Sequence, residues 1–217
     1  GIDLNLDRCS LSNNYTAGYG GGLDLYAPSG TLNLDIQNSF ITDNFASHAG
    51  GGIRVISAAP DSMLSINSST ITANVGSGED GVYLYAFDGI TLNCAIQNSI
   101  LWGNGNSGGG LPTGDLVHSQ IGAGTVISTK VMGSDVGEVS GVDYQDMGYN
   151  VNLNPLFRNP AAGNYHLRKT SPLRDAAPCG TLIPGAQPLT YECTSLAPLL
   201  DYDGDNRPVG CCDDCDM

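Results

Sequence analysis

The feature that most constrains this chain is a pattern that recurs four times in its first hundred residues. Equivalent residues stand 30 positions apart in three columns: Leu6, Ile36, Ile66 and Ile96; Leu11, Ile41, Ile71 and Leu101; Asn14, Asn44, Asn74 and Asn104. A glycine-rich run follows each copy. A fixed period of about 20 to 50 residues is typical of proteins built from stacked structural repeats. The chain is therefore predicted to be a solenoid.

Apolar and polar residues alternate inside each copy, as at Leu4 and Leu6 and again at Leu23 and Leu25. This period of two is the spacing of a β-strand, and no helical stripe competes with it. Copies stacked about 4.8 Å apart would pair as parallel strands with equivalent residues in register. We therefore predict an all-β fold, a right-handed single-stranded parallel β-helix of about 30 residues per coil.

The organisation of the chain is predicted to change along its length. Coils should occupy residues 1–149 and be regular to about residue 105, because the period fails beyond that point. Residues 150–217 should continue the β-helix and then form an irregular C-terminal cap that carries disulfides. Several prolines in this last part exclude a long helix.

The asparagine column is the most regular polar feature of the sequence. Asparagine tolerates the left-handed conformation that a sharp turn needs. Its amide can also donate to, and accept from, the equivalent amide one coil away. We therefore interpret Asn14, Asn44, Asn74 and Asn104 as an internal structural ladder and not as a ligand site.

Net charge restricts the partners of the chain. The sequence has 8 Lys+Arg and 22 Asp+Glu, so its formal charge is -14. Such a surface repels nucleic acid and anionic membranes and favours divalent cations. No apolar run is long enough to span a membrane. Gly1 opens directly on a predicted strand with nothing before it to cover the stack. Because an uncapped stack end is an open strand edge, we expect either that an N-terminal part has been removed or that this end associates with another chain.

Outward-facing side chains are where a binding function would be found. Asp24 should lie one coil from Arg54 and form an exposed ion pair with it. Four aromatic residues are predicted to project from the strands or their ends: Tyr26, Tyr83, Tyr85 and Trp102. Aromatic rings combine apolar area with a polar edge, which suits the faces of sugars. These rings are therefore candidates for carbohydrate binding, with a role as loop-covered core residues as the alternative.

Three segments carry a family resemblance: IQNSILWGN, GYNVNLNPLFRNPAAGNYHLRKTSPLRDAA and DYDGDNRPVG. They resemble bacterial extracellular right-handed parallel β-helix repeat proteins, often labelled choice-of-anchor Q domain proteins. The matching positions are Leu101 to Asn104, Asn154 to Phe157, Gly163 to Leu167, Ser171 to Ala176 and Asp201 to Pro208. The resemblance implies the fold and a secreted or cell-surface location, but one fold carries many functions. The family continues into a further strand where this chain reads CCDDCDM, so we expect an anchor to be missing.

The seven cysteines form two groups. Cys9 and Cys94 take inward positions about three coils apart, too far for a bridge, so both are predicted to be buried free thiols. The others are disulfide candidates in a secreted protein: Cys179, Cys193, Cys211, Cys212 and Cys215. Their connectivity cannot be read from the sequence. Zinc binding by the last three is an alternative with unusual spacing.

Asp201, Asp203 and Asp205 stand at alternate positions around Gly204, as in calcium-binding loops. The later glutamate of such loops is absent, because Arg207 stands at the seventh position. Calcium at these aspartates is therefore a candidate beside a plain turn.

Two functional interpretations remain. The favoured one is a non-catalytic extracellular or cell-surface module, structural or adhesive, that binds a glycan or surface ligand or assembles into filaments. The alternative is a polysaccharide lyase or glycoside hydrolase that acts on acidic polysaccharide. Such enzymes need carboxylates gathered with cations or histidine. The regular coils carry only Arg8 and Arg54 as cations, and His48 is expected in a glycine turn away from a carboxylate column.

Overall fold

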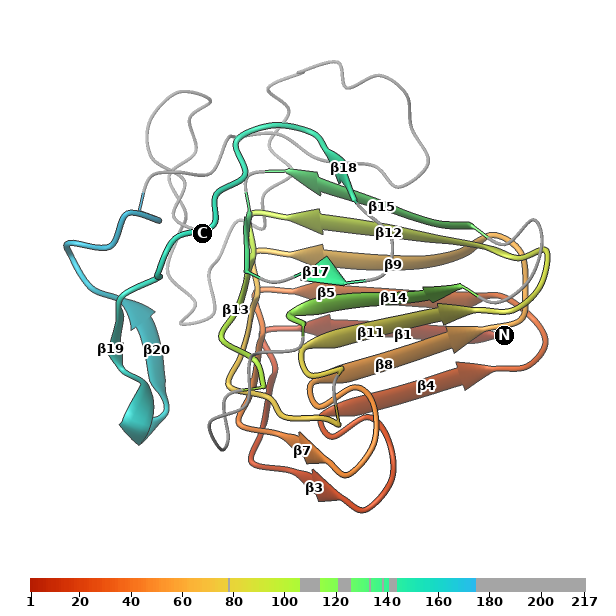
Figure 1. Ribbon diagram of the computed structural model, residues 1–217, viewed down its shortest axis with the longest axis horizontal. Coiled ribbons are helices and arrows are strands. Elements are labelled where there is room, and N and C mark those ends of the chain that lie inside the picture. Colours follow the sequence, from red (N-terminus) through yellow and green to blue (C-terminus); the bar gives the residue numbers. More distant parts are fainter. Residues whose placement is uncertain are drawn as a thin grey trace.

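The computed structural model describes residues 1–77, 79–105, 114–120, 126–132, 134–137, 139–140 and 144–174. Almost all described secondary structure is β-strand, and most strands belong to three parallel sheets that run along one stack (Figure 1). The predicted all-β parallel β-helix with about 30 residues per coil is confirmed, since strands of successive coils in the regular part pair 30 positions apart, or 29 between β8 (Ile53–Ser57) and β11 (Val82–Ala86).

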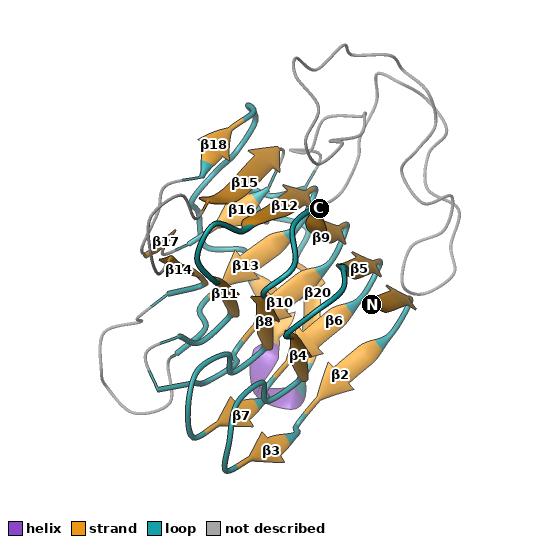
Figure 2. Cartoon of the chain, turned by 90° about the vertical axis from the view of Figure 1, so that its right-hand side faces the viewer, coloured by secondary structure: helices purple, strands orange, loops and turns teal. Residues whose placement is uncertain are grey.

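Each of the first five coils contributes one strand to each of the three sheets, and the first sheet has a sixth strand. The first sheet contains β1 (Ile2–Asp7), β5 (Leu32–Gln37), β9 (Ser62–Asn67), β12 (Thr91–Gln97), β15 (Val126–Met132) and β18 (Gln145–Asp146). The second contains β2 (Ser10–Ser12), β6 (Phe40–Thr42), β10 (Thr70–Thr72), β13 (Ile100–Trp102) and β16 (Asp135–Val136). The third contains β4 (Leu23–Ala27), β8 (Ile53–Ser57), β11 (Val82–Ala86), β14 (Leu116–Gln120) and β17 (Val139–Ser140). Short strands β3 (Tyr15–Thr16) and β7 (Phe45–Ala46) pair on an outer loop between the second and third sheets (Figure 2).

The core is a set of apolar columns between the three sheets. Leu34 pairs with Leu64, which pairs in turn with Cys94, and all three side chains are buried. Ile36 and Ile66 form a parallel column beside them. Inward positions are apolar and outward positions are polar because successive residues of a strand face opposite sides. The repeat in the sequence therefore becomes a continuous buried core.

The sharp turn after each of the first four strands of the second sheet, β2, β6, β10 and β13, depends on a left-handed residue. These residues are Asn13, Asp43, Ala73 and Gly103, with φ of 57, 56, 57 and 65°. Each one immediately precedes a ladder asparagine, and the ladder asparagines are not among the residues with positive φ. The prediction that the ladder asparagines themselves adopt this conformation was wrong. Their role is hydrogen bonding, which needs ordinary backbone angles.

The two regular-coil cysteines differ in burial. Cys94 is 1% exposed, as predicted, and burial raises the pKa of its thiol to about 12. Cys9 is half-buried, because no described coil lies on the other side of the first one. Both thiols are free. The expectation that both are buried is therefore correct for Cys94 alone.

A small antiparallel hairpin lies against the second sheet (Figure 1). It consists of β19 (Phe157–Asn159), the 3-10 turn η1 (Pro160–Ala162) and β20 (Asn164–Leu167). Phe157 and Tyr165 form a second hydrophobic cluster with Ile100 of β13. The hydroxyl of Tyr165 lies 2.8 Å from both carboxylate oxygens of Asp43, 122 positions earlier in the chain. This contact attaches the hairpin to the second coil.

None of the helical structure in the described residues is long and apolar enough to cross a membrane.

Candidate functional site

The four asparagines form one continuous hydrogen-bonded file. The Nδ2 of Asn14, Asn44 and Asn74 each donates to Oδ1 of the next asparagine at 2.9 Å. The file ends on Asp115, whose Oδ1 accepts from Nδ2 of Asn104 at 2.6 Å and from its backbone N–H at 2.8 Å. Asn44, Asn74 and Asn104 are buried and their amides are engaged inside the stack, whereas Asn14 lies exposed on the first coil. The file therefore stabilises coil stacking.

The four aromatic candidates do not form one surface. Tyr83 and Tyr85 lie on β11, with ring centroids 6.4 Å apart. Tyr26 is 51% exposed and lies two coils away from Tyr85 in the same column, with Ile56 between them. Trp102 belongs to β13 of the second sheet. The sequence could not separate these positions, because an outward aromatic looks the same on any face of the coil.

A groove of about 390 Å³ lies beside Tyr83 and Tyr85 on the third sheet. We name it the tyrosine groove, defined by Tyr19, His48, Arg54, Glu79, Tyr83 and Tyr85. β8 and β11 place Arg54 directly beside Tyr83 in register. The other members come from the glycine-rich loops that precede β4, β8 and β11. The groove therefore combines aromatic faces with a cation, an imidazole and a carboxyl group.

Arg54 is held from two sides. Its Nε and Nη2 donate to the two carboxylate oxygens of Asp24 at 2.7 and 2.8 Å, which confirms the predicted pair. Its Cζ lies 4.0 Å from the centroid of the Tyr19 ring, a cation–π geometry. The bidentate contact satisfies the charge of Arg54 and fixes its orientation. Arg54 therefore presents a flat, largely neutralised surface to the groove.

His48 and Glu79 are groove residues that the sequence did not identify. The His48 ring stacks on Tyr19 with a centroid distance of 4.9 Å. Burial, and then the nearby charge of Asp80, raises the pKa of the Glu79 carboxyl. His48 lies in the glycine-rich turn before β8, as expected, and one carboxyl group, that of Glu79, lines the same groove. No repeat column contains these residues, so the periodic pattern carried no signal for them.

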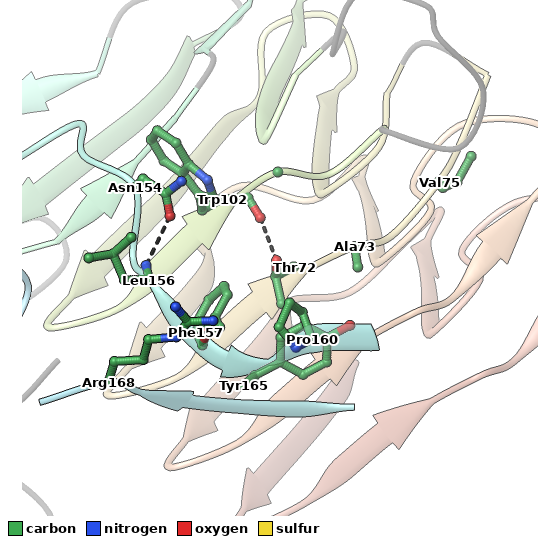
Figure 3. A pocket seen from close by; sticks show the side chains of 11 residues that line it. Thr72, Ala73, Val75, Trp102, Asn154, Leu156, Phe157, Pro160, Tyr165 and Arg168 are labelled. Atoms are coloured by element: carbon green, nitrogen blue, oxygen red, sulfur yellow. Dashed lines mark hydrogen bonds between the residues drawn. The ribbon is translucent and has the colours of Figure 1, made fainter. Parts of the chain in front are cut away.

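A second cavity, of about 480 Å³, lies between the second sheet and the β19–β20 hairpin (Figure 3). We name it the hairpin pocket, defined by Thr72, Trp102, Asn154, Leu156, Phe157 and Arg168. Trp102 comes from the coil, whereas Leu156 and Phe157 come from the hairpin segment. The Thr72 hydroxyl donates to the Trp102 carbonyl at 2.6 Å, so these two lining residues of neighbouring coils are joined.

A buried carboxyl lies where β16 meets the segment before the hairpin. One oxygen of Asp135 accepts from the Leu153 N–H at 3.0 Å, and the other has no hydrogen-bond partner among the described residues. Burial is the main cause that raises the pKa of Asp135 to about 7, and the charge of Asp115 adds to it. The Leu153 N–H acts in the opposite direction because it favours the ionised form.

Within the described residues, no three His, Cys, Asp or Glu side chains are grouped so that they could hold a metal ion. The calcium candidates Asp201, Asp203 and Asp205 lie outside the described residues. So do the disulfide candidates Cys179, Cys193, Cys211, Cys212 and Cys215.

Comparison of the chain with protein-family models, with curated proteins and with solved structures found no match. The resemblance to choice-of-anchor Q domain proteins therefore stays a prediction.

Proposed function

We propose that this chain is an extracellular β-helix scaffold that binds neutral glycans in the tyrosine groove. The observation that carries the proposal is the side-by-side placement of Tyr83 and Tyr85 next to Arg54 in a groove of about 390 Å³. Tyrosine rings supply apolar faces for the C–H faces of a sugar and hydroxyls for its rim. A rigid stack of parallel strands holds these rings without a large ordering cost on binding.

Charge favours neutral over acidic glycans. The chain carries a formal charge of -14, so a polymer of acidic sugars meets like charge as it approaches. Arg54 is the groove cation best placed to offset this, but Asp24 already binds its guanidinium. This pairing disfavours cleavage or binding of acidic polysaccharide, the alternative considered from the sequence.

A glycan array with matched neutral and acidic glycans tests the proposal, followed by calorimetric titration of the best neutral ligand. Tyr83→Ala and Tyr85→Ala each remove a stacking face, worth about 1 to 2 kcal/mol, and should weaken binding about 5- to 30-fold. Tyr26→Ala is the matched control, because Tyr26 is an exposed tyrosine of the same sheet outside the groove. Preference for acidic glycans, or equal losses in all three variants, would refute the proposal.

Glycan cleavage is a second candidate because Glu79 and His48 line the same groove. A carboxyl group with a raised pKa can remain protonated and donate a proton to a leaving oxygen. New reducing ends should then appear when the bound neutral glycan is incubated with the protein, and Glu79→Gln should abolish them. If the glycan binds but no new reducing ends are released, the proposed glycan binding stands and the proposed glycan cleavage is refuted.

A further inference from the structure

The hairpin pocket has the dimensions of a small-molecule site. Its volume of about 480 Å³ falls within the range of about 300 to 1,000 Å³ that is usual for ligand pockets. Trp102 lines it on the coil side, and Leu156 and Phe157 line it on the hairpin side (Figure 3). A ligand with a flat apolar body can therefore bury its faces between two structural layers.

Arg168 supplies a positive charge to the lining of this pocket. Its Nε donates to the Phe157 carbonyl at 3.0 Å, and its Nη2 lies 3.4 Å from the Arg158 carbonyl. No carboxylate in the described part of the chain forms an ion pair with it. Backbone carbonyls orient the guanidinium without neutralising it. The planar fork of arginine is suited to bind a carboxylate through two parallel hydrogen bonds.

The hairpin segment is also basic within an acidic protein. From Met147 to Arg174 the sequence has four Lys+Arg and no Asp or Glu, whereas the whole chain carries -14. Asp43 binds the Tyr165 hydroxyl and is not part of the pocket lining. A local excess of positive charge beside an apolar cavity attracts anions to it. Arg54 of the tyrosine groove differs in this respect, because Asp24 neutralises it.

We propose that the hairpin pocket binds a small ligand that carries a carboxylate on an apolar ring. The ring packs against Trp102, and the carboxylate pairs with Arg168. This site is separate from the tyrosine groove and does not depend on glycan binding there, because the two cavities share no lining residue.

The protein contains its own reporter of this pocket, since Trp102 is its single tryptophan. The test is a fluorescence titration of the whole chain with phenylacetate, using excitation at the long-wavelength edge of tryptophan absorption. Phenylacetamide is the matched neutral ligand, with the same ring and almost the same shape. We expect a saturable change with phenylacetate and an affinity for phenylacetamide that is about tenfold weaker. Absence of a saturable change, or equal affinity for the two ligands, would overturn the proposal.

Substitutions of the hairpin arginines then test which residue pairs with the carboxylate of the ligand. Arg168→Gln should weaken phenylacetate about tenfold and abolish its advantage over phenylacetamide, while Arg168→Lys should recover part of it. Arg158→Gln is the matched control, because it removes the same charge from the same hairpin at a residue that does not line the pocket. Circular dichroism of each variant verifies the fold. If Arg158→Gln and Arg168→Gln weaken phenylacetate equally, the effect comes from net charge alone and the proposed pairing is wrong.

Discussion

The asparagine ladder predicts that the cost of losing an asparagine depends on its position in the stack. Asn74 is fully buried, and its Oδ1 accepts from the backbone N–H and Nδ2 of Asn44. The two N–H groups of its Nδ2 are shared among the carbonyls of Ile41 and Thr72 and Oδ1 of Asn104. In the Asn74→Ala variant, two buried donors of Asn44 lose their acceptor. Each buried donor without a partner costs about 1 to 3 kcal/mol, so the variant should lose about 2 to 6 kcal/mol of unfolding free energy.

Asn14→Ala is the internal control for this experiment. Asn14 is exposed on the first coil, and its Nδ2 makes one side-chain hydrogen bond, to Asn44. Its removal should cost only about 0.5 to 1.5 kcal/mol. Urea unfolding followed by circular dichroism measures both values, and an unchanged m-value would show that the same transition is compared. Equal losses at the two positions would refute the idea that buried amide pairing carries the stability of the file.

Two further predictions concern buried ionisable groups. The pKa of Asp135 is about 7 in the folded chain against an ordinary value of 3.8. Asp135 therefore does not lower the free energy of unfolding below about pH 4, where the carboxyl is protonated in both states. As pH rises from about 4 to about 7, the unfolded chain ionises first and the folded state loses at most about 4 kcal/mol of stability. Since an asparagine there would bury unpaired N–H groups at about 1 to 3 kcal/mol, Asp135→Asn should stabilise the protein by about 1 to 3 kcal/mol at about pH 8 but not at about pH 4. A urea midpoint shift that is the same at both pH values would contradict this. Cys94, buried and with its thiol pKa raised to about 12, should resist iodoacetamide under native conditions while the half-buried Cys9 reacts. Peptide mapping by mass spectrometry measures both, and equal labelling would contradict the burial difference.

The tertiary contacts of the regular coils could be predicted because, in a solenoid, residues at equivalent positions of successive repeats lie next to each other. Leu34 and Leu64 are 30 positions apart and pair side by side, and Asp24 meets Arg54 by the same rule. Between β8 and β11 the separation is 29 positions, because the loop before β11 is one residue shorter. Tyr83 therefore pairs with Arg54. Any contact between equivalent positions was therefore accessible from the period alone.

Contacts between non-equivalent positions were not accessible in this way. His48 stacks on Tyr19 between the glycine-rich loops of successive coils, where the His48 N–H donates to the Gly18 carbonyl. Tyr19 and His48 are 29 positions apart, so they are not equivalent in the repeat of 30. The left-handed turn residues also stand one position before the asparagines that the sequence suggested, because side-chain hydrogen bonds and backbone turns require different residues.

The sequence by itself determined the coil, its length and its buried columns, because those features follow from hydrophobic alternation and from a constant repeat. Tertiary structure alone decided where the two cavities lie. Tyr165 reaches Asp43 across 122 positions, and this contact places the hairpin beside Trp102. No local preference specifies a contact over such a separation, since it is selected only when the whole stack presents a complementary surface.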